Sequence, residues 1–252
     1  MIETLSQPQQ VSMADEWFRF ATPDHFWMQW RHRLVVRALE HAGTQVGRIL
    51  EIGCGHGVAR EMLERDLNIA VDGCDLNLAA LELAKPGKGE LFLYNILDQE
   101  PSLIGRYDAV LLLDVIEHIA DERAFLEAAS RHLRPGGVVI VNVPANMLLF
   151  SEYDTAAGHL RRYTPATVTE LFSQCGIKEQ RIEPWGMLMI PSLLVRKLLL
   201  RGTKRSGAIR TGFVPPNAMW RVLLQCVKNI ETALPFSMPW GTSILAWGRL
   251  PV

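Results

Sequence analysis

The chain has few cysteines and almost no excess of charge. Its 252 residues include four cysteines, and these show neither a CxxC pair nor the spacing of zinc ligands. We therefore expect reduced thiols in a cytoplasmic protein. The formal net charge is −1, which argues against a general electrostatic attraction to nucleic acid.

Long apolar runs are also missing. Residues 1–10 lack the basic start and apolar core of a signal peptide, and we expect a flexible polar tail there. The longest apolar segment, residues 185–200, contains Arg196 and Lys197 and is broken by Pro191, so it is too short and too charged to span a bilayer. It predicts a helix packed on the domain or covering the substrate site. A peripheral membrane contact is the alternative.

The middle of the chain alternates between two patterns. Apolar strands are predicted at residues 48–52, 70–75, 91–95, 109–113 and 138–143, and helices at residues 58–66, 78–84 and 122–132. Strands that are apolar throughout, separated by amphipathic helices, favour an α/β fold with a parallel sheet covered on both faces. Right-handed crossovers make such a sheet doubly wound, with the ligand at the carboxyl ends of the strands.

The flanking segments predict additions to this core. Residues 17–42 predict one or two helices, and beyond residue 144 we expect helices at 165–175 and 218–233 and strands at 178–184 and 242–249. We therefore divide the chain into a tail with lid helices (1–43), a Rossmann-like core (44–182), and a helical insertion with a closing strand of the same domain (183–252).

The most informative motif is the run Ile-Leu-Glu-Ile-Gly-Cys-Gly-His-Gly at residues 49–57. Glycine tolerates positive φ and has no Cβ, so three glycines spaced two apart allow a sharp turn and let a ligand touch the main chain. The helix that follows offers unpaired N–H groups. Asp75 ends the next apolar run, where a carboxylate can accept hydrogen bonds from the two hydroxyls of a ribose.

The motif and three later segments resemble one enzyme family. With Glu51 in the strand, the spacing Gly-x-Gly-x-Gly is similar to the nucleoside-binding loop of the class I S-adenosylmethionine (SAM)-dependent methyltransferases. Residues 107–119 (YDAVLLLDVIEHI) and 133–137 (LRPGG) resemble that family's fourth strand and the turn before its fifth. The Val-Ile-Glu-His form is similar to the ubiquinone-biosynthesis type, and residues 158–164 (GHLRRYT) to a branch acting on glycan or lipid-linked metabolites.

The resemblance covers residues 48–177 and carries a fold and a cofactor. It implies a mostly parallel seven-stranded sheet with an antiparallel final strand, with N-terminal helices and C-terminal helical additions, and SAM as the cofactor. The residues that it places around SAM are Arg31, Glu51, Gly53, Cys54, Gly55, Gly57, Asp75, Leu76, Asn95, Ile96, Leu113 and Asp114.

Four of these residues have a more specific expected role. Glu51 would bind the amino group of SAM, and Arg31 its carboxylate, while Leu76 packs on the adenine. Asn95 stands where relatives commonly carry an acidic residue that reads the adenine amino group. Its carbonyl can still accept that hydrogen bond, and Asp98 is the alternative acceptor.

Methyl transfer asks little of the protein beyond alignment, since the sulfonium is already activated. A base is needed only if the acceptor must lose a proton. His118 is the first candidate and His159 the second, although each also fits a structural role. Alternatively, Glu117 with both histidines could hold a divalent metal that orients a diol. We assign no metal site, because three ligands at a clear spacing are not evident.

Residues 161–163 form a possible binding site for the acceptor. Arg161, Arg162 and Tyr163 could bind a phosphate or carboxylate of an anionic acceptor. The alternative is that one arginine pairs with a carboxylate such as Asp154 while Tyr163 packs in the core.

The sequence therefore predicts a SAM-dependent methyltransferase of a small-molecule acceptor, with O-methylation favoured and a hydrophobic, lipid-linked or glycan-related substrate. A cytoplasmic location is expected, and a peripheral membrane contact through residues 185–200 is the alternative to a helix packed on the domain. An NAD(P)-dependent oxidoreductase is the first alternative, but the chain lacks G-x-G-x-x-G spacing and a Tyr-x-x-x-Lys pair. A non-catalytic SAM-binding protein is the second, and Asp114, Glu117 and His118 argue against it. The acceptor and the oligomeric state stay open.

Overall fold

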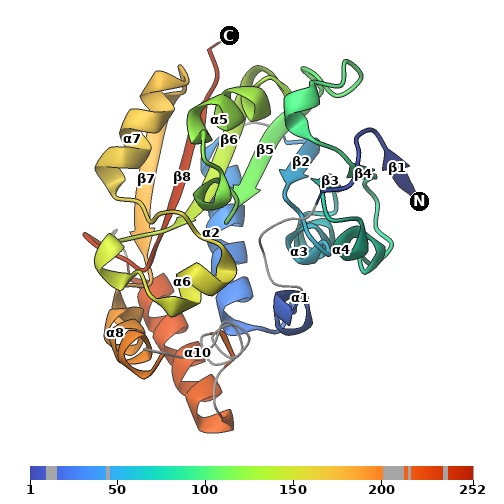
Figure 1. The fold of residues 1–252 in the computed structure, drawn as a ribbon. Coiled ribbons are helices and arrows are strands. Elements are labelled where there is room, and N and C mark those ends of the chain that lie inside the picture. The colour runs from blue at the N-terminus through green and yellow to red at the C-terminus, as the bar shows by residue number, and fades with distance from the viewer. Residues whose placement is uncertain (10–15, 44–45, 201–212, 215–216, 235–237, 252) are drawn as a thin grey trace.

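The computed structural model describes residues 1–9, 16–43, 46–200, 213–214, 217–234 and 238–251. Its centre is one eight-stranded sheet in the order β1-β4-β3-β2-β5-β6-β8-β7 (Figure 1). The strands are β1 (Ile2–Thr4), β2 (Arg48–Ile52), β3 (Ala70–Asp75), β4 (Leu91–Leu93), β5 (Tyr107–Leu113), β6 (Leu133–Pro144), β7 (Lys178–Trp185) and β8 (Ser243–Arg249). Strand β8 runs antiparallel to both of its neighbours, and the other pairs are parallel.

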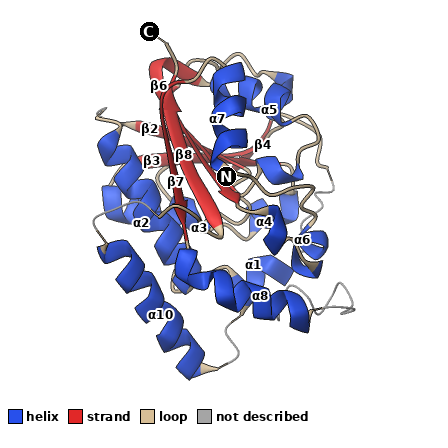
Figure 2. Cartoon of the chain, turned by 90° about the vertical axis from the view of Figure 1, so that its left-hand side faces the viewer, coloured by secondary structure: helices blue, strands red, loops and turns tan. Residues whose placement is uncertain are grey.

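Helices cover both faces of the sheet, as the alternating pattern predicts (Figure 2). They are α1 (Glu16–Phe20), α2 (Phe26–His41), α3 (Val58–Leu67), α4 (Leu78–Glu82), α5 (Glu122–Ser130), α6 (Glu152–Ala157), α7 (Pro165–Gln174), α8 (Ile190–Leu199) and α10 (Ala218–Ala233). Single turns of 3₁₀-helix are η1 (Ile96–Asp98), η2 (Ile116–His118), η3 (Met147–Leu149) and η4 (Met187–Met189).

The period of the strands divides the core between these two layers. Successive side chains of a strand point to opposite faces. In β5, Val110 and Leu112 belong to the cluster that packs under α5 and α7, whereas Ala109 and Leu111 belong to the cluster under α2 and α3. Every residue of β5 is buried, as expected for a central strand of a sheet covered on both sides. The prediction of a doubly wound α/β sheet with an antiparallel final strand is confirmed.

The N-terminal tail prediction is wrong for residues 2–4, which add an eighth strand to the predicted seven. Strand β1 pairs in parallel with β4, with Ile2 opposite Leu91 and Thr4 opposite Leu93. The outer edge of β4 would otherwise expose unpaired backbone groups. Ile2 also packs against the apolar cluster that contains Leu91 and Leu93. Three residues are too short to show a strand pattern, so the sequence alone did not reveal this pairing.

The remaining differences lie in the C-terminal half. Helix α6 was not predicted, and the apolar segment 185–200 begins with the end of β7 and η4 before α8 starts at Ile190. None of the ten side chains of α8 is buried. In the part of the chain that the structure describes, no helix is both long enough and apolar enough to cross a membrane.

Candidate active site

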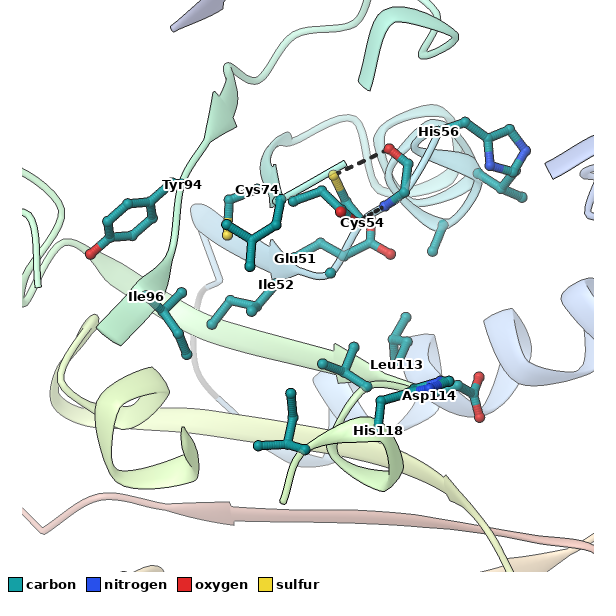
Figure 3. A pocket seen from close by; sticks show the side chains of 18 of the residues that line it. Glu51, Ile52, Cys54, His56, Cys74, Tyr94, Ile96, Leu113, Asp114 and His118 are labelled. Carbon is teal, nitrogen blue, oxygen red and sulfur yellow. Dashed lines mark hydrogen bonds between the residues drawn. The ribbon is translucent and has the colours of Figure 1, made fainter. Parts of the chain in front are cut away.

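A cavity of about 400 Å³ lies at the carboxyl ends of β2, β3 and β5 (Figure 3). The last residue of each strand and the residues that follow it form part of the cavity wall. They are Ile52 to Gly55 at the end of β2, Asp75 and Leu76 at the end of β3, and Leu113 to Val115 at the end of β5. This is the edge at which a doubly wound sheet binds its ligand. Because the strands are parallel neighbours, loops far apart in sequence converge here.

The glycine loop follows β2 and requires glycine where it turns. Gly53, Gly55 and Gly57 have φ of +72°, +54° and +75°. A Cβ on Gly53 would lie 2.6 Å from Cγ2 of Val115, and a Cβ on Gly55 would lie 3.0 Å from Cε1 of Phe18. Larger residues are therefore excluded by both conformation and space. The loop consequently presents bare main chain to the cavity.

Asp75 holds this loop in place. The N–H groups of Gly55 and Asn77 donate to the two carboxylate oxygens of Asp75 at 2.7 Å and 2.8 Å. Burial raises the pKa of Asp75, although these hydrogen bonds act in the opposite direction. Each oxygen keeps a second lone pair that can accept a hydrogen bond from a hydroxyl. The two elements of a nucleoside site are thus in direct contact.

Glu51 is a second carboxylate at the cavity. It is only 3% exposed, and its Oε2 accepts a hydrogen bond from the N–H of Arg60 at 3.0 Å. Burial raises the pKa of Glu51 to about 7, although Arg31 and Arg60 oppose the shift. An ammonium group in the cavity would favour the ionised form. Glu51 is therefore suited to bind a cationic ligand group.

The opposite wall contains a charged network centred on Asp114. Asp114 has a φ of +61°, in the left-handed region that residues other than glycine rarely adopt. Nη1 of Arg31 lies 2.5 Å from its Oδ2, and Nδ2 of Asn142 donates to its Oδ1 at 2.8 Å. Nε1 of Trp185 in turn donates to Oδ1 of Asn142 at 3.0 Å. Burial raises the pKa of Asp114 against the attraction of Arg31.

His118 lies in the same wall, beside Asp114 (Figure 3). Burial lowers the pKa of His118 to about 4, so the imidazole is neutral at pH 7. Its Nδ1 lies 3.2 Å from the carbonyl oxygen of Gly158, which fits a tautomer with the proton on Nδ1. Nε2 is then the basic nitrogen. His118 is thus a neutral imidazole in the wall of the cavity.

His159 and Glu117 lie behind His118, outside the lining of the cavity. The rings of His118 and His159 are nearly perpendicular, with centroids 4.9 Å apart. Nδ1 of His159 is 2.9 Å from Oδ1 of Asp154, and its Nε2 is 3.9 Å from Oε1 of Glu117. His159 therefore connects one buried carboxylate to another.

Glu117 is fully buried, and among the described residues neither carboxylate oxygen has a hydrogen-bond partner. Burial, reinforced by the negative charge of Asp114, raises the pKa of Glu117 well above its ordinary value. One ligand atom from each of Glu117, His118 and His159 lies within 4.8 Å of the others. The structure thus assembles the three residues that the sequence offered as an alternative metal site.

Comparison with known proteins agrees with this geometry. A family model described as "Methyltransferase domain" matches residues 18–189, more than half of the chain. The chain belongs to the class I SAM-dependent methyltransferase family. The cofactor expected from the resemblance is the one that this family uses.

Individual relatives of this methyltransferase are distant. It is 30% identical over 160 residues to a "Probable S-adenosylmethionine-dependent methyltransferase" of Mycolicibacterium smegmatis, covering 62% of this chain and 60% of that protein. It is 32% identical over 183 residues to a ubiquinone biosynthesis O-methyltransferase of Rhodopseudomonas palustris, covering 69% and 65%. The matches thus span 60–65% of the length of these two relatives.

A solved structure gives the same fold. Phosphoethanolamine N-methyltransferase 2 of Haemonchus contortus, in complex with SAM, superposes with a TM-score of 0.57 at 18% identity. The superposition covers 86% of this chain and 52% of that one. At this identity the likeness extends to the fold alone.

The methyltransferase places almost all of its predicted cofactor residues around the cavity. Gly57 is the exception, because it lies at the N-cap of α3 and does not line the cavity. Asn95 does line it, but its side-chain oxygen already accepts a hydrogen bond from Leu97 N–H at 3.1 Å, which leaves one lone pair for an adenine. The alternative acceptor, Asp98, instead accepts a hydrogen bond from Ser6 Oγ at 2.6 Å and does not line the cavity.

The predicted acceptor cluster is arranged differently. Arg161 lies 2.8 Å from Glu122, and the hydroxyl of Tyr163 donates to the same carboxylate. Nε of Arg162 is 2.8 Å from Asp154, and its Nη1 donates to a backbone carbonyl at 3.0 Å. None of the three lines the cavity. The internal pairing considered as the alternative is present, with Arg162 on Asp154 and Tyr163 in the core, and an acceptor site at these three residues stays a prediction.

Sequence reasoning missed several lining residues that carry no motif. Trp17 and Phe18 of α1, His56 of the glycine loop, and the apolar side chains of Tyr94, Val115, Ile119 and Phe125 complete the wall. Their contribution depends on how distant segments pack, so no local pattern could identify them. The density of aromatic residues after residue 16 was the one available signal, and it pointed to a lid without naming these residues.

The raised pKa of Glu51 makes two properties depend on pH. The folded protein binds this proton more tightly than the unfolded chain, so the free energy of unfolding falls by about 3 kcal/mol as the pH rises from 4.5 to about 7. A ligand ammonium favours the carboxylate, so SAM affinity should rise over the upper part of the same range and level off above it. Chemical unfolding and calorimetry at pH 5.5 to 8.5 measure both trends.

The Glu51→Gln variant tests whether Glu51 causes the pH dependence of stability and of SAM affinity. At pH 8 we expect the variant to be more stable than the wild type and to bind SAM at least about tenfold more weakly, without the pH dependence near 7. Glu61→Gln on α3, which removes a carboxylate paired with Lys85 at the surface, serves as the control and should change neither property. Wild-type SAM affinity in Glu51→Gln at pH 8 would contradict the assigned role.

Proposed function

We propose that this methyltransferase transfers a methyl group from SAM to an oxygen of a small-molecule acceptor that is hydrophobic, lipid-linked or glycan-related. One observation carries the proposal. The bond from Gly55 N–H to Asp75 joins the glycine loop to a ribose-binding carboxylate, and the same cavity holds the neutral imidazole of His118. The names of the curated relatives, which include ubiquinone biosynthesis O-methyltransferases, support an oxygen acceptor.

The residues around the cavity fit the donor. Gly53 and Gly55 leave space that a Cβ would fill, and Asp75 can accept hydrogen bonds from the ribose hydroxyls. Glu51 is a buried carboxylate suited to the amino group, and Arg31 is the cation at the cavity that would reach the carboxylate of SAM. When bound, SAM supplies an electrophilic methyl group on a sulfonium. The protein then has to orient the acceptor and exclude water.

His118 is the proposed base. Gly158 holds Nδ1, so that Nε2 can take the proton of an acceptor hydroxyl as the methyl group is transferred. His159 and Glu117, which lie behind His118, would support this role. Asp154, which is held by Arg162, accepts a hydrogen bond from Nδ1–H of His159. This bond fixes the orientation of the imidazole ring. The positive charge that forms on His118 would then lie beside the carboxyl group of Glu117.

Binding and turnover test this proposal and its non-catalytic alternative. We expect SAM and S-adenosylhomocysteine to bind at sub-millimolar concentrations, and Asp75→Asn to weaken both at least about tenfold because it removes the ionised acceptor. Asp98→Asn is the control and should bind normally. Calorimetry measures affinity, and a panel of phenols, sugars and lipid-linked hydroxyl compounds with methyl-labelled SAM measures turnover. Tight binding of SAM without turnover on any acceptor would favour the non-catalytic role.

The pH profile tests His118. We expect kcat/KM to fall as the pH drops through about 4, because only the neutral imidazole accepts a proton, and not near the ordinary histidine pKa of 6.5. His118→Gln should lower kcat about 10²- to 10⁴-fold while SAM binding is retained. His32→Gln, a histidine paired with Asp66, is the control. Unchanged kcat in His118→Gln would exclude this base.

A second role for the same residues follows from the unpartnered carboxylate of Glu117. Glu117, His118 and His159 would hold a divalent cation, with Asp154 on the outer nitrogen of His159 as metal-bound histidines commonly have. The cation would polarise the acceptor oxygen and remove the proton from Glu117. In this case chelation with EDTA should abolish turnover, Zn²⁺, Mn²⁺ or Mg²⁺ should restore it, and binding of the metal alone should release a proton. Full activity in EDTA would leave His118 as the base without a metal.

The cytoplasmic location and the membrane contact of residues 185–200 also stay proposals. The segment ends in a helix without a single buried side chain, and this supports the contact.

A further inference from the structure

Helix α10 differs from an ordinary surface helix in the side chains that it exposes: several large apolar residues face outward, and two charged residues are buried. Of its sixteen residues, the buried ones are Leu224, Lys228 and Glu231, and two of these carry charge. Lys228 donates to Gln29 Oε1 at 3.1 Å, and Glu231 accepts hydrogen bonds from the N–H groups of η4. These polar contacts, together with the buried Leu224 and with Val227 against the apolar cluster that contains Trp30, attach α10 to the rest of the fold. A surface helix normally buries its apolar face and exposes its polar one.

The apolar side chains of α10 lie on its outer surface. Met219, Val222, Leu223 and Ile230 are 73%, 63%, 48% and 56% exposed. They recur at intervals of three, four and seven residues, and therefore share one face of the helix. Each of these side chains is thus about half exposed or more, and together they form an apolar strip along the helix.

Helix α8 adds a second exposed apolar strip. Leu194, Val195, Leu198 and Leu199 are 45–72% exposed, and α8 packs on η3, where Leu148 is 76% exposed. Both α8 and α10 contact η4, and Figures 1 and 2 show the two helices at one end of the molecule. We call the exposed apolar residues of α8, α10 and η3 the end surface.

The charge of this region is uniform. The described residues between 184 and 230 include four basic side chains, Arg196, Lys197, Arg221 and Lys228, and no aspartate or glutamate, although the whole chain carries a net charge of −1. Arg221 is exposed on α10, and Lys197 is half-buried on α8. A positive apolar surface on helices that lie along it matches an anionic membrane, which offers both acyl chains and negative headgroups. A second copy of the chain would bring a surface of the same sign.

The end surface is joined to the active site. Leu200, after the end of α8, packs with Ala156 and Ala157 of α6, and Trp17 of the cavity wall packs against the same cluster. Arg196 of α8 lies over the ring of Tyr153 at 4.5 Å, and α6 leads directly to His159. The arrowheads of β5 and β7 in Figure 1 point to this end. The residues that line the cavity include the carboxyl end of β5, Leu113.

We propose that the end surface docks on an anionic lipid bilayer, so that the mouth of the cavity faces lipid and takes its acceptor from the membrane. The docking deepens the proposed function, since the acceptor would then be a membrane-embedded molecule with a hydroxyl at the headgroup level. Binding to the bilayer itself requires neither SAM nor an acceptor.

Co-sedimentation of the full-length protein with vesicles tests the docking. We expect binding to phosphatidylcholine vesicles that contain about 30% phosphatidylglycerol, little binding to phosphatidylcholine alone, and weaker binding at high salt. Val195→Glu with Leu198→Glu, or Val222→Glu with Ile230→Glu, should each lower the partition coefficient at least about tenfold, because both remove apolar contact and add negative charge. Leu83→Glu, at a leucine 64% exposed directly after α4, is the matched control and should bind as the wild type does.

Three outcomes would overturn the proposal. These are an absence of binding to the anionic vesicles, wild-type binding by both double variants, and a dimer in light scattering that Val222→Glu with Ile230→Glu dissociates while vesicles remain unbound. SAM affinity, measured on every variant, shows that the fold is intact. Because vesicle binding is read without turnover, a failure of docking and a failure of the methyltransferase assignment are distinguishable.

Discussion

The hydrogen bond from Gly55 N–H to the Asp75 carboxylate is the interaction on which the site depends. It closes only because β2 and β3 are parallel neighbours, with Ile52 opposite Cys74, so that their two ends meet. The N–H groups of Gly53 and Cys54 donate to the carbonyl of Cys74 at 2.8 Å and 3.1 Å and bring the loop against β3. Gly73 permits this approach, since a Cβ there would lie 2.9 Å from Sγ of Cys54. Glycine is thus required on both sides of the contact.

Buried carboxylates in the wall of the cavity and directly behind it lower the stability of the fold. Glu51, Asp114 and Glu117 all have raised pKa values, and burial is the largest cause for each. A folded protein keeps such groups only where the rest of the structure is stable enough to hold them. Here the fully buried central strand and the two apolar layers supply that stability. These buried carboxylates are therefore suited to binding, because a bound cation or a positively charged ligand group would stabilise their ionised form.

The C-terminal additions differ in character from the core. Helices α5 and α7 bury mainly apolar residues against the sheet, whereas α10 buries Lys228 and Glu231 beside Leu224 and leaves several large apolar side chains exposed. A polar attachment is more specific in geometry than an apolar one, because each donor needs its own acceptor. It leaves the apolar strip available at the end of the molecule where the cavity lies. The fold thus combines a conventional binding core with an unusual outer surface.

The sequence by itself determined the alternation of strands and helices, the glycine loop and the acid that follows it, because these depend on periodicity and on residues needed locally. Eleven of the twelve residues that the family resemblance places around SAM also line the cavity, and most of them lie at or near the end of a predicted strand. Tertiary structure decided what local patterns cannot express. Residues 2–4 form an edge strand because they pair with β4. Arg162 is held inside the protein because it pairs with Asp154. Trp17 lines the cavity because of the way α1 packs. The same holds for α10: its amphipathic pattern predicted a helix, but only the contacts of Lys228 and Glu231 revealed which face is buried, because periodicity specifies a face and not its partner.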